Sequence, residues 1–355
     1  MAGVLRQQGW TQPRPTQARP PGDEGMMGAF ARMAELVGVP PTRLMRDFAG
    51  LSFGPGRVAI GDYERLRLYD EAFWAGGDRR AVVGAKRGRE IALQVNFRHE
   101  WLGLTQNRLV WGAYLAAHGL PVIPTLAIYT EGLATPSRLL LRTREELRAF
   151  LEEQPDRPLV GRPAEGGQAT AIVGRAASAI EHLVDDICEN HGPGYLFQPL
   201  VAPDARIAPL TDGRLAAVRL VTVAGDRGPR VVRALWRLSG APDAVAPIDL
   251  RSGQITRVSA RSPVSGARIP DWEAVKAAAV ETARLLRHLP MLGFDVAPSA
   301  AGPVIVGLTA TPDLALLQLA DRRGLLDADF VNFLESQRRL AAEHVEQAKA
   351  DAACS

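Results

Sequence analysis

Hydrophobic residues recur along the chain at two spacings, which separate predicted helices from predicted strands. In residues 101–118 the apolar positions repeat every three or four residues, as on one face of a helix, and Gly119 follows as a stop. Thr143 with Glu146 three residues later forms a capping box at the start of another helix. The same criteria predict helices over residues 26–37, 42–48, 62–69, 143–153, 176–189, 271–288 and 329–349.

Shorter runs of β-branched and aromatic residues, bounded by glycine and proline, predict strands. They lie at residues 125–129, 157–162, 170–173, 195–201, 213–224 and 230–238. We therefore expect alternating strands and helices up to about residue 130, followed by a mainly antiparallel α+β part.

The stretch 291–318 predicts a strand, a turn, a second strand and a helix in succession. The first strand, 293–298, places Asp295 on the face opposite its apolar neighbours. A turn at 299–302 leads into a strand rich in β-branched residues, after which Pro312 opens a helix. This hairpin is the segment around which the rest of the prediction is organised.

Two of the predicted helices carry more specific expectations. Asp271 stands at the start of the predicted helix 271–288, where a side-chain carboxylate can cap the first turn. The closing helix, 329–349, is expected to bury four apolar side chains against the rest of the protein, which are Phe330, Phe333, Leu334 and Leu340.

Composition places the chain among ordinary globular proteins. Of its 355 residues 46% are hydrophobic and 23% charged. The sequence contains no run of 18 apolar residues, so it predicts no membrane span. The first residues lack the apolar stretch of a signal peptide, which favours the cytoplasm. Two cysteines, Cys188 and Cys354, indicate neither a disulfide framework nor a zinc site.

The basic residues are almost all arginine. Lysine occurs only at Lys86, Lys276 and Lys349, so 39 of the 42 basic residues are arginines. They are scattered among acidic residues and not clustered with aromatic ones, so we expect no nucleic-acid surface. One of them, Arg219, stands inside the apolar strand 213–224, where an unpaired charge is costly. It must therefore meet an anion or a cleft, or else form a structural ion pair.

The order of these motifs resembles that of the ATP-grasp ligases over residues 60 to 320. A hairpin with an aspartate on its first strand, ending at a polar triplet and a proline, resembles the metal-binding hairpin of that superfamily. The strand from Leu215 to Thr222 is similar to one in the sugar-transfer-associated branch, and Arg162-Pro163 before a glycine-rich loop resembles the phosphate lid.

The resemblance implies an ATP-grasp fold of the α+β and α/β type. Its expected parts are a disordered arm over residues 1–25, an N-terminal helical and α/β region over 26–130, a lid subdomain over 131–200, an antiparallel C-terminal lobe over 201–325, and a C-terminal helix and tail over 326–355.

The resemblance also implies a nucleotide site with ATP and Mg²⁺ as cofactors. Asp295 and Thr309 take metal positions, Gly307 stands where the superfamily has a glutamate, and Asp249 or Asp313 would have to supply further ligands. Arg219 is the implied catalytic residue, in contact with phosphate or acyl phosphate. The implied ATP-binding residues are Arg108 and Arg162, in place of two lysines, with Gly166, Gly167, Gln198 and Leu200. Judged without the resemblance, Arg108 is a solvated helix arginine.

Two functions follow from this pattern. The first is a divergent ATP-dependent carboxylate ligase, which activates a small-molecule carboxylate as an acyl phosphate for an amine-type nucleophile; the branch name implies a role in envelope polysaccharide or peptide tailoring. The second is a catalytically inactive pseudo-ligase that serves as a binding or scaffold protein. The loss of the expected ligands at two metal positions, Gly307 and Thr309, together with arginines in place of both lysines, favours the second function more than any single change would.

Overall fold

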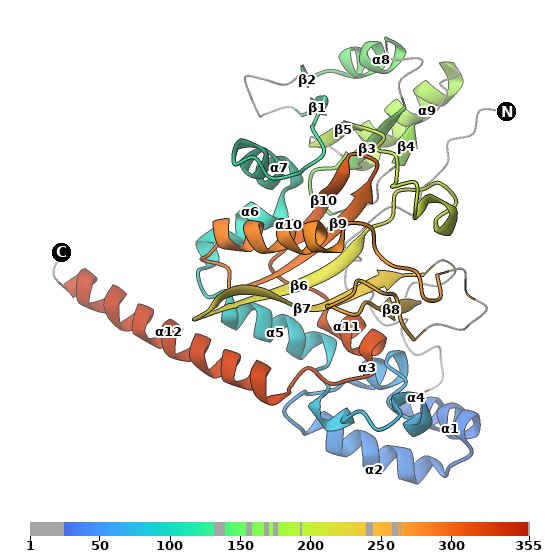
Figure 1. The fold of residues 1–355 in the computed structure, drawn as a ribbon, viewed down its shortest axis with the longest axis vertical. Coiled ribbons are helices and arrows are strands. Elements are labelled where there is room, and N and C mark those ends of the chain that lie inside the picture. The colour runs from blue at the N-terminus through green and yellow to red at the C-terminus, as the bar shows by residue number, and fades with distance from the viewer. Residues whose placement is uncertain are drawn as a thin grey trace.

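A computed structural model describes residues 25–130, 139–153, 158–166, 170–172, 177–191, 194–238, 244–257, 262 and 264–353. Its strands form two five-stranded sheets, with helices packed around them (Figure 1). The predicted fold class, a mixture of helix and mainly antiparallel sheet, is confirmed. The expected arm at 1–25 lies almost wholly outside the described residues.

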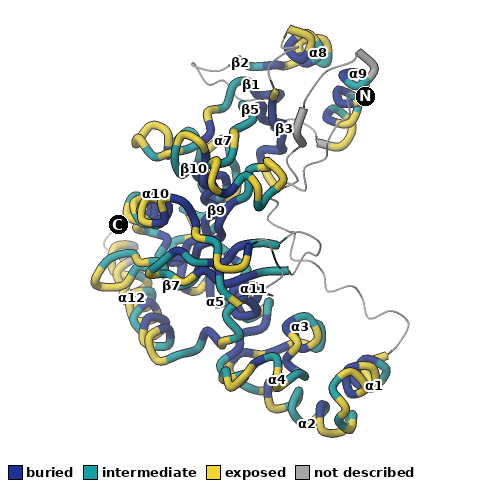
Figure 2. The backbone as a smooth tube through the Cα atoms, turned by 45° about the vertical axis from the view of Figure 1, so that its right-hand side comes forward, coloured by how far each residue is buried: buried dark blue, intermediate teal, exposed yellow. Residues whose placement is uncertain are grey.

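The core sheet has the strand order β10-β9-β6-β7-β8, and neighbouring strands are antiparallel. The strand β9, which lies between β10 and β6, is buried along its whole length, as Figure 2 shows. The predicted hairpin at 291–318 is confirmed: β9 and β10 form it, with a turn two residues shorter than expected. The bounds are β6 Val218–Gly225, β7 Gly228–Arg237, β8 Val245–Pro247, β9 Met291–Ser299 and β10 Gly302–Thr309.

Helices cover both faces of the core sheet, because side chains of alternating positions on each strand pack into two separate cores. Val218, Leu220 and Phe294 pack toward α10 (Trp272–Leu285). Val221 and Leu235 face the opposite side, where three further helices pack, α5 (Ala85–Val95), α11 (Leu314–Asp321) and α12 (Ala328–Ala353). Arg219 and Asp295 share this second face with Val221 and Leu235.

The second sheet has the order β2-β1-β5-β3-β4, in which only the β1–β2 pair is parallel. Two helices, α8 and α9, pack against it around a core of its own. In Figure 1 the hairpin of β9 and β10 points toward this sheet. The bounds are β1 Ala127–Tyr129, β2 Leu139–Leu141, α8 Arg144–Glu152, β3 Leu159–Pro163, β4 Thr170–Ile172, α9 Ala177–Asp186, a π-helical turn Ile187–His191 and β5 Tyr195–Pro199.

Residues 25–126 are helical, and no strand begins before β1 in this part of the chain. We had expected an α/β region here. Instead, the helices of residues 26–95 pack their apolar sides on one another and on α11, whereas α6 and α7 pack on each other and against β10. The bounds are α1 Met26–Val37, α2 Pro41–Ser52, α3 Ile60–Arg65, α4 Glu71–Trp74, α6 Leu102–Gln106 and α7 Arg108–Ala117, with 3₁₀ turns at Arg79–Ala81, His99–Trp101 and, later, Ala208–Leu210.

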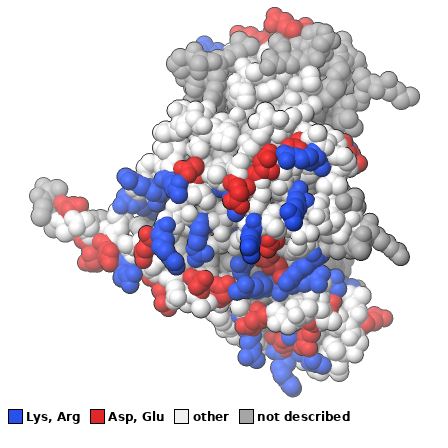
Figure 3. Space-filling view, viewed as in Figure 1, with Lys and Arg blue, Asp and Glu red and all other residues white. Residues whose placement is uncertain are grey.

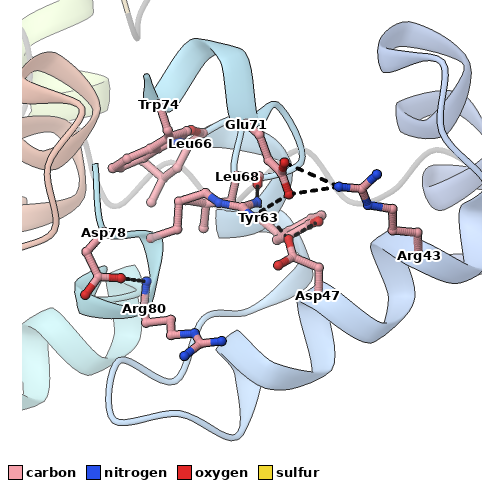
Figure 4. A network of polar contacts seen from close by, with 10 residues as sticks. Arg43, Asp47, Tyr63, Leu66, Leu68, Glu71, Trp74, Asp78 and Arg80 are labelled. Carbon is pink, nitrogen blue, oxygen red and sulfur yellow. Dashed lines mark hydrogen bonds and ion pairs between the residues drawn. The ribbon is translucent and has the colours of Figure 1, made fainter. Parts of the chain in front are cut away.

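A polar network fixes the segment from α3 to α4 (Figure 4). Arg79 donates to Asp47 at 2.9 Å, to Glu71 at 3.0 Å and to the carbonyl of Leu68. The hydroxyl of Tyr63 donates to the same Asp47 carboxylate at 2.8 Å. Burial and this carboxylate raise the pKa of Tyr63, so the phenol stays a neutral donor. The network therefore holds α2, α3 and α4 in one arrangement.

Three local predictions differ from the structure. The predicted helix 101–118 is broken at Asn107, whose side chain accepts hydrogen bonds from the N–H groups of Leu109 and Val110 and so starts α7 as a new helix. Asp271 adopts a left-handed backbone conformation, and its carboxylate pairs with Arg206 and does not cap α10. The side chain expected to be buried at the end of the last helix, Leu340, is 44% exposed, because α12 extends past the sheet there.

A buried amide joins the N-terminal helices to the core. The side-chain oxygen of Gln318 accepts from the N–H groups of Val83 at 2.8 Å and Leu325 at 3.1 Å. Its side-chain nitrogen donates to the carbonyls of Val83 at 2.9 Å and Leu314 at 3.2 Å. Because Gln318 is fully buried, no water can replace these partners.

Replacing Gln318 with leucine should lower the free energy of unfolding by about 2–4 kcal/mol, since each buried backbone group left without a partner costs about 1–3 kcal/mol. Urea unfolding followed by circular dichroism measures the change. The control is Gln347→Leu on the exposed side of α12, which should stay within about 0.5 kcal/mol of the original protein. Equal stabilities of the two variants would contradict a structural role for the buried amide.

Candidate functional site

The candidate site lies where the start of α7 and the end of β3 meet the β9–β10 hairpin. The N–H of Arg108 donates to the carbonyl of Ala164 at 2.7 Å, which joins α7 to the loop after β3. The N–H of Ile305 donates to Pro121 at 2.7 Å, which joins the hairpin to the segment after α7. Three segments far apart in the sequence therefore converge on this point.

The central feature of the site is an ion pair between Arg219 and Asp295, which lie opposite each other on β6 and β9. The guanidinium donates from Nε to Oδ1 at 2.9 Å and from Nη2 to Oδ2 at 3.0 Å. Each side chain is only 8% exposed. Although burial lowers the pKa of Arg219, the charge and hydrogen bonds of Asp295 raise it above its ordinary value. Of the roles that the sequence left open for Arg219, the structure therefore shows the ion pair.

Gly307 lies on β10 directly opposite Asp295, so Arg219, Asp295 and Gly307 form one row across three strands. A β-carbon at position 307 would lie 2.8 Å from Oδ2 of Asp295 and 3.1 Å from its Cβ. The aspartate therefore occupies the space that a side chain at 307 would need. The register of β10 also shifts between Ile305 and Gly307, a β-bulge of the kind often found beside functional sites.

The residues at the implied metal positions do not fit Mg²⁺. Asp295 already receives two hydrogen bonds from Arg219, and Gly307 has no side chain to offer. The hydroxyl of Thr309 accepts from the N–H of Thr311 at 3.1 Å. Among the described residues no three histidine, cysteine or acidic side chains gather in a group that could hold a metal ion. Magnesium requires several oxygen ligands in near-octahedral geometry, which this set does not provide.

The two acidic residues considered as substitute ligands are committed elsewhere. Asp249 accepts from the N–H of Ser252 at 2.7 Å and from its hydroxyl at 2.6 Å. Asp313 caps α11 and pairs with Arg65 at 3.2 Å. Both carboxylates therefore stabilise local structure, and neither one joins Asp295 in a metal-binding group.

Arg108 and Arg162 lie on the other side of the site, and in the described structure both guanidinium groups contact carbonyl oxygens. Arg162 donates to Val306 at 3.3 Å, and its Nε has no hydrogen-bond partner. Arg108 donates to Pro163 at 3.1 Å and to Gly166. Burial, with the positive charge of Arg108 beside it, lowers the pKa of Arg162 to about 9. The burial of these two positive charges next to each other is therefore electrostatically unfavourable.

The remaining implied ATP-binding residues are used within the structure or lie outside it. The side-chain nitrogen of Gln198 donates to Ile123 at 3.0 Å, and the N–H of Leu200 donates to Pro158 at 3.1 Å. Gly166 adopts a left-handed backbone conformation beside Arg108. Gly167 lies outside the described residues.

Arg108 and Arg162 line a narrow cavity with a volume of about 10 Å³. This is room for about one water molecule. A nucleotide can enter only if the two sheets move apart. The other lining residues are Trp111, Gly112, Val122, Ile123, Gln198, Ile305 and Val306.

The sequence did not indicate that further charged residues lie near the pair of Arg219 and Asp295. Arg65 pairs with Asp313, whose charge helps to raise the pKa of Arg219, and buried Asp62 lies near both Arg65 and Asp313. Burial raises the pKa of Asp62 above its ordinary value. An acidic and a basic residue one helical turn apart, as in Asp62 and Arg65, was the available signal, but many solvated helices show the same pattern.

No family model matches the sequence, and a search of the curated proteins finds no match. Several solved structures are similar to this chain at low sequence identity. They include the ATP-grasp ligase PsnB complexed with a minimal precursor (TM-score 0.39, 18% identity, covering 66% of this chain and 62% of that one). A second is the D-alanine-D-alanine ligase from Coxiella burnetii (TM-score 0.44, 10% identity, covering 70% of this chain and 60% of that one). A third is the D-cycloserine synthetase DcsG (TM-score 0.41, 18% identity, covering 79% of this chain and 93% of that one).

The chain spans about three fifths of the length of the first two of these structures. At identities of 10–18% and TM-scores below 0.5, the likeness does not indicate which residues of this chain bind or react. In the part of the chain that the structure describes, no helix combines the length and the apolar character needed to cross a membrane.

Replacing Gly307 with alanine should lower the free energy of unfolding by about 1–3 kcal/mol, because the new methyl group displaces Asp295 from Arg219. Chemical denaturation measures this change. Gly225→Ala, at the end of β6, is the matched control, since a β-carbon there meets no atom within 4 Å and should leave stability equal or slightly higher. If Gly307→Ala proved as stable as its control, the packing of Asp295 over this glycine would not be a real constraint.

Proposed function

We propose that this chain is a non-catalytic protein of ATP-grasp architecture, which holds the phosphates of a nucleotide with arginine side chains and without a magnesium site. The pair between Arg219 and Asp295 is the observation that carries this proposal. Arg219 occupies both oxygens of Asp295 and would compete with a metal for this carboxylate, and the adjacent Gly307 adds no ligand. A carboxylate at 307 would collide with Asp295, so the two arrangements exclude each other.

Arg108 and Arg162 supply the charge that would hold the phosphates. Both guanidinium groups are largely withdrawn from water and bonded to carbonyl oxygens. Arg162 has no carboxylate counter-charge, whereas Arg108 is partly compensated by Asp295, and a bound phosphate would provide further counter-charge to both. Arginine also presents a planar fork of donors that matches phosphate oxygens. Binding requires the sheets to separate, because the present cavity admits only about one water molecule.

A divergent ATP-dependent carboxylate ligase is the second candidate, favoured by a specific observation. Arg219 bonds to Asp295 and the charge of Asp295 also acts on Arg108, while the charge of Arg108 acts in turn on Arg162, so the three arginines lie within one electrostatic network. Phosphoryl transfer depends largely on positioning and on positive charge around the transferred group. In this reading the arginines would orient the phosphates and the carboxylate substrate.

Calorimetric titration with a non-hydrolysable ATP analogue separates the two candidates. We expect affinities equal within about twofold in Mg²⁺ and in EDTA, because no metal-binding group takes part. Arg162→Gln should weaken binding at least tenfold, about 1.4 kcal/mol. The control is Arg339→Gln, an exposed arginine on α12, which should change nothing.

The opposite pattern would support the ligase. Binding that strengthens with Mg²⁺, together with ADP release in a screen of carboxylates and amines, would overturn the non-catalytic proposal. Absence of binding under both conditions would overturn the nucleotide part of it. Arg162→Gln should not lower the free energy of unfolding, since it removes a buried charge, so a loss of binding in this variant would not reflect a loss of folding.

A further inference from the structure

A second and larger cavity lies where α3, α4 and α11 meet β8. Its volume is about 270 Å³, slightly below the range of about 300–1,000 Å³ typical of sites for drug-sized ligands. Four arginines line it, namely Arg65, Arg67, Arg257 and Arg322. The remaining wall is apolar and consists of Phe73, Leu238, Ala244, Val245, Leu319 and Ala320.

Three of the four arginines have a left-handed backbone. The φ angles are +51° at Arg67, +54° at Arg257 and +51° at Arg322. Residues with a β-carbon seldom adopt this conformation, and glycine or asparagine is the usual choice at a helix end such as Arg322, which follows α11. Backbone strain of this kind concentrates at functional sites. Here three strained positions direct their side chains to one cavity.

Two of these arginines are stacked on one aromatic ring. The guanidinium carbon of Arg67 lies 4.3 Å from the ring centroid of Phe73, and that of Arg322 lies 4.2 Å from it. Cation–π contact stabilises this arrangement, although the two like charges repel each other. Burial, with the charges of Arg257 and Arg67, lowers the pKa of Arg322.

The acidic residues around the cavity do not neutralise its charge. Arg67 pairs with Asp70 at 2.6 Å, and Arg65 pairs with Asp313 at 3.2 Å. Arg257 donates to the carbonyl oxygen of Asp321, whose carboxylate pairs with Arg233. Within the described part of the chain, neither Arg257 nor Arg322 forms an ion pair with a carboxylate. The charge of Asp321 acts on Arg257 and that of Asp70 on Arg322, so the positive charge of the cavity is only partly compensated.

The arginine-bearing segments are held in place before any ligand arrives. The network in Figure 4 ties down the chain on both sides of Arg67, through Tyr63 and Leu68. Trp74 adds a hydrogen bond of 3.0 Å to the carbonyl of Leu66. In Figure 3 basic side chains gather over the junction of the N-terminal helices with the core sheet. The segment that carries Arg67 and the Phe73 ring is thus pre-organised, which reduces the entropy lost on binding.

We propose that this cavity binds a small phosphorylated molecule, with its phosphate against Arg257 and Arg322 and an apolar portion against Leu238, Val245 and Leu319. A phosphate monoester carries up to two negative charges and three terminal oxygens, which can accept the remaining N–H donors of Arg257 and Arg322. The aliphatic wall favours a ligand with an apolar part over inorganic phosphate. This site is separate from the cleft at Arg108 and Arg162, and the inference does not depend on nucleotide binding there.

The test is calorimetric titration of the full chain in a chloride buffer with phenyl phosphate, inorganic phosphate and benzoate. Phenyl phosphate should bind saturably at one site, at least tenfold more tightly than inorganic phosphate, and benzoate should not bind measurably. Binding of benzoate as tight as that of phenyl phosphate would indicate a general carboxylate or aromatic site and would overturn the proposal.

Variants at the strained position keep the test independent of folding. Arg322→Gly suits the left-handed backbone, so it should fold with unchanged or higher thermal stability while losing phenyl phosphate binding at least tenfold. Arg257→Gln should lose binding to a similar extent. The exposed Arg339→Gln is the matched control and should bind as the original protein does.

Arg162→Gln should also leave phenyl phosphate binding intact, which distinguishes failure of this proposal from failure of the nucleotide proposal. Equal binding by Arg322→Gly, Arg257→Gln and Arg339→Gln would show that phosphate associates with the basic surface in general, and it would overturn the assignment of this cavity. Absence of phenyl phosphate binding by the original protein would overturn it directly.

Discussion

The ion pair between Arg219 and Asp295 is the constraint on which the centre of this structure depends. Two opposite charges are buried in the middle of a sheet, and each remains tolerable only while it bonds to the other. Their pairing fixes the register of β6 on β9, since a shift of one strand by one residue would place the two side chains on opposite faces of the sheet. Gly307 completes the row by leaving space for the aspartate.

This constraint also determines what chemistry the site can perform. Arg219 competes with any metal for the Asp295 carboxylate, and under the proposed function the charge that meets phosphates comes from guanidinium groups. These groups are planar and permanently charged, and they bind by directed hydrogen bonds, whereas Mg²⁺ polarises phosphate oxygens as a compact ion. The arrangement is therefore better suited to holding an anion than to driving phosphoryl transfer.

The same use of arginine recurs on the other side of α11. There the N-terminal helices, which replace the expected α/β region, bring Arg65 and Arg67 toward Arg257 and Arg322. Arg65 lines the larger cavity and is also linked to the ion pair, because the charge of its partner Asp313 helps to raise the pKa of Arg219. A continuous row of charges thus connects the cleft between the sheets with the larger cavity, although each contains its own cations.

The sequence by itself determined the local elements, because spacing and turn residues act over a few positions. Examples are the β9–β10 hairpin, the capping box at Thr143 and the mixed α+β class. It also singled out Arg219 and Asp295, since a charge inside an apolar strand must be accounted for. The partner of each charge, the break at Asn107 and the meeting of four arginines around one cavity were decided only by the tertiary structure. These features depend on contacts between residues distant in sequence, which hydrophobic periodicity does not encode.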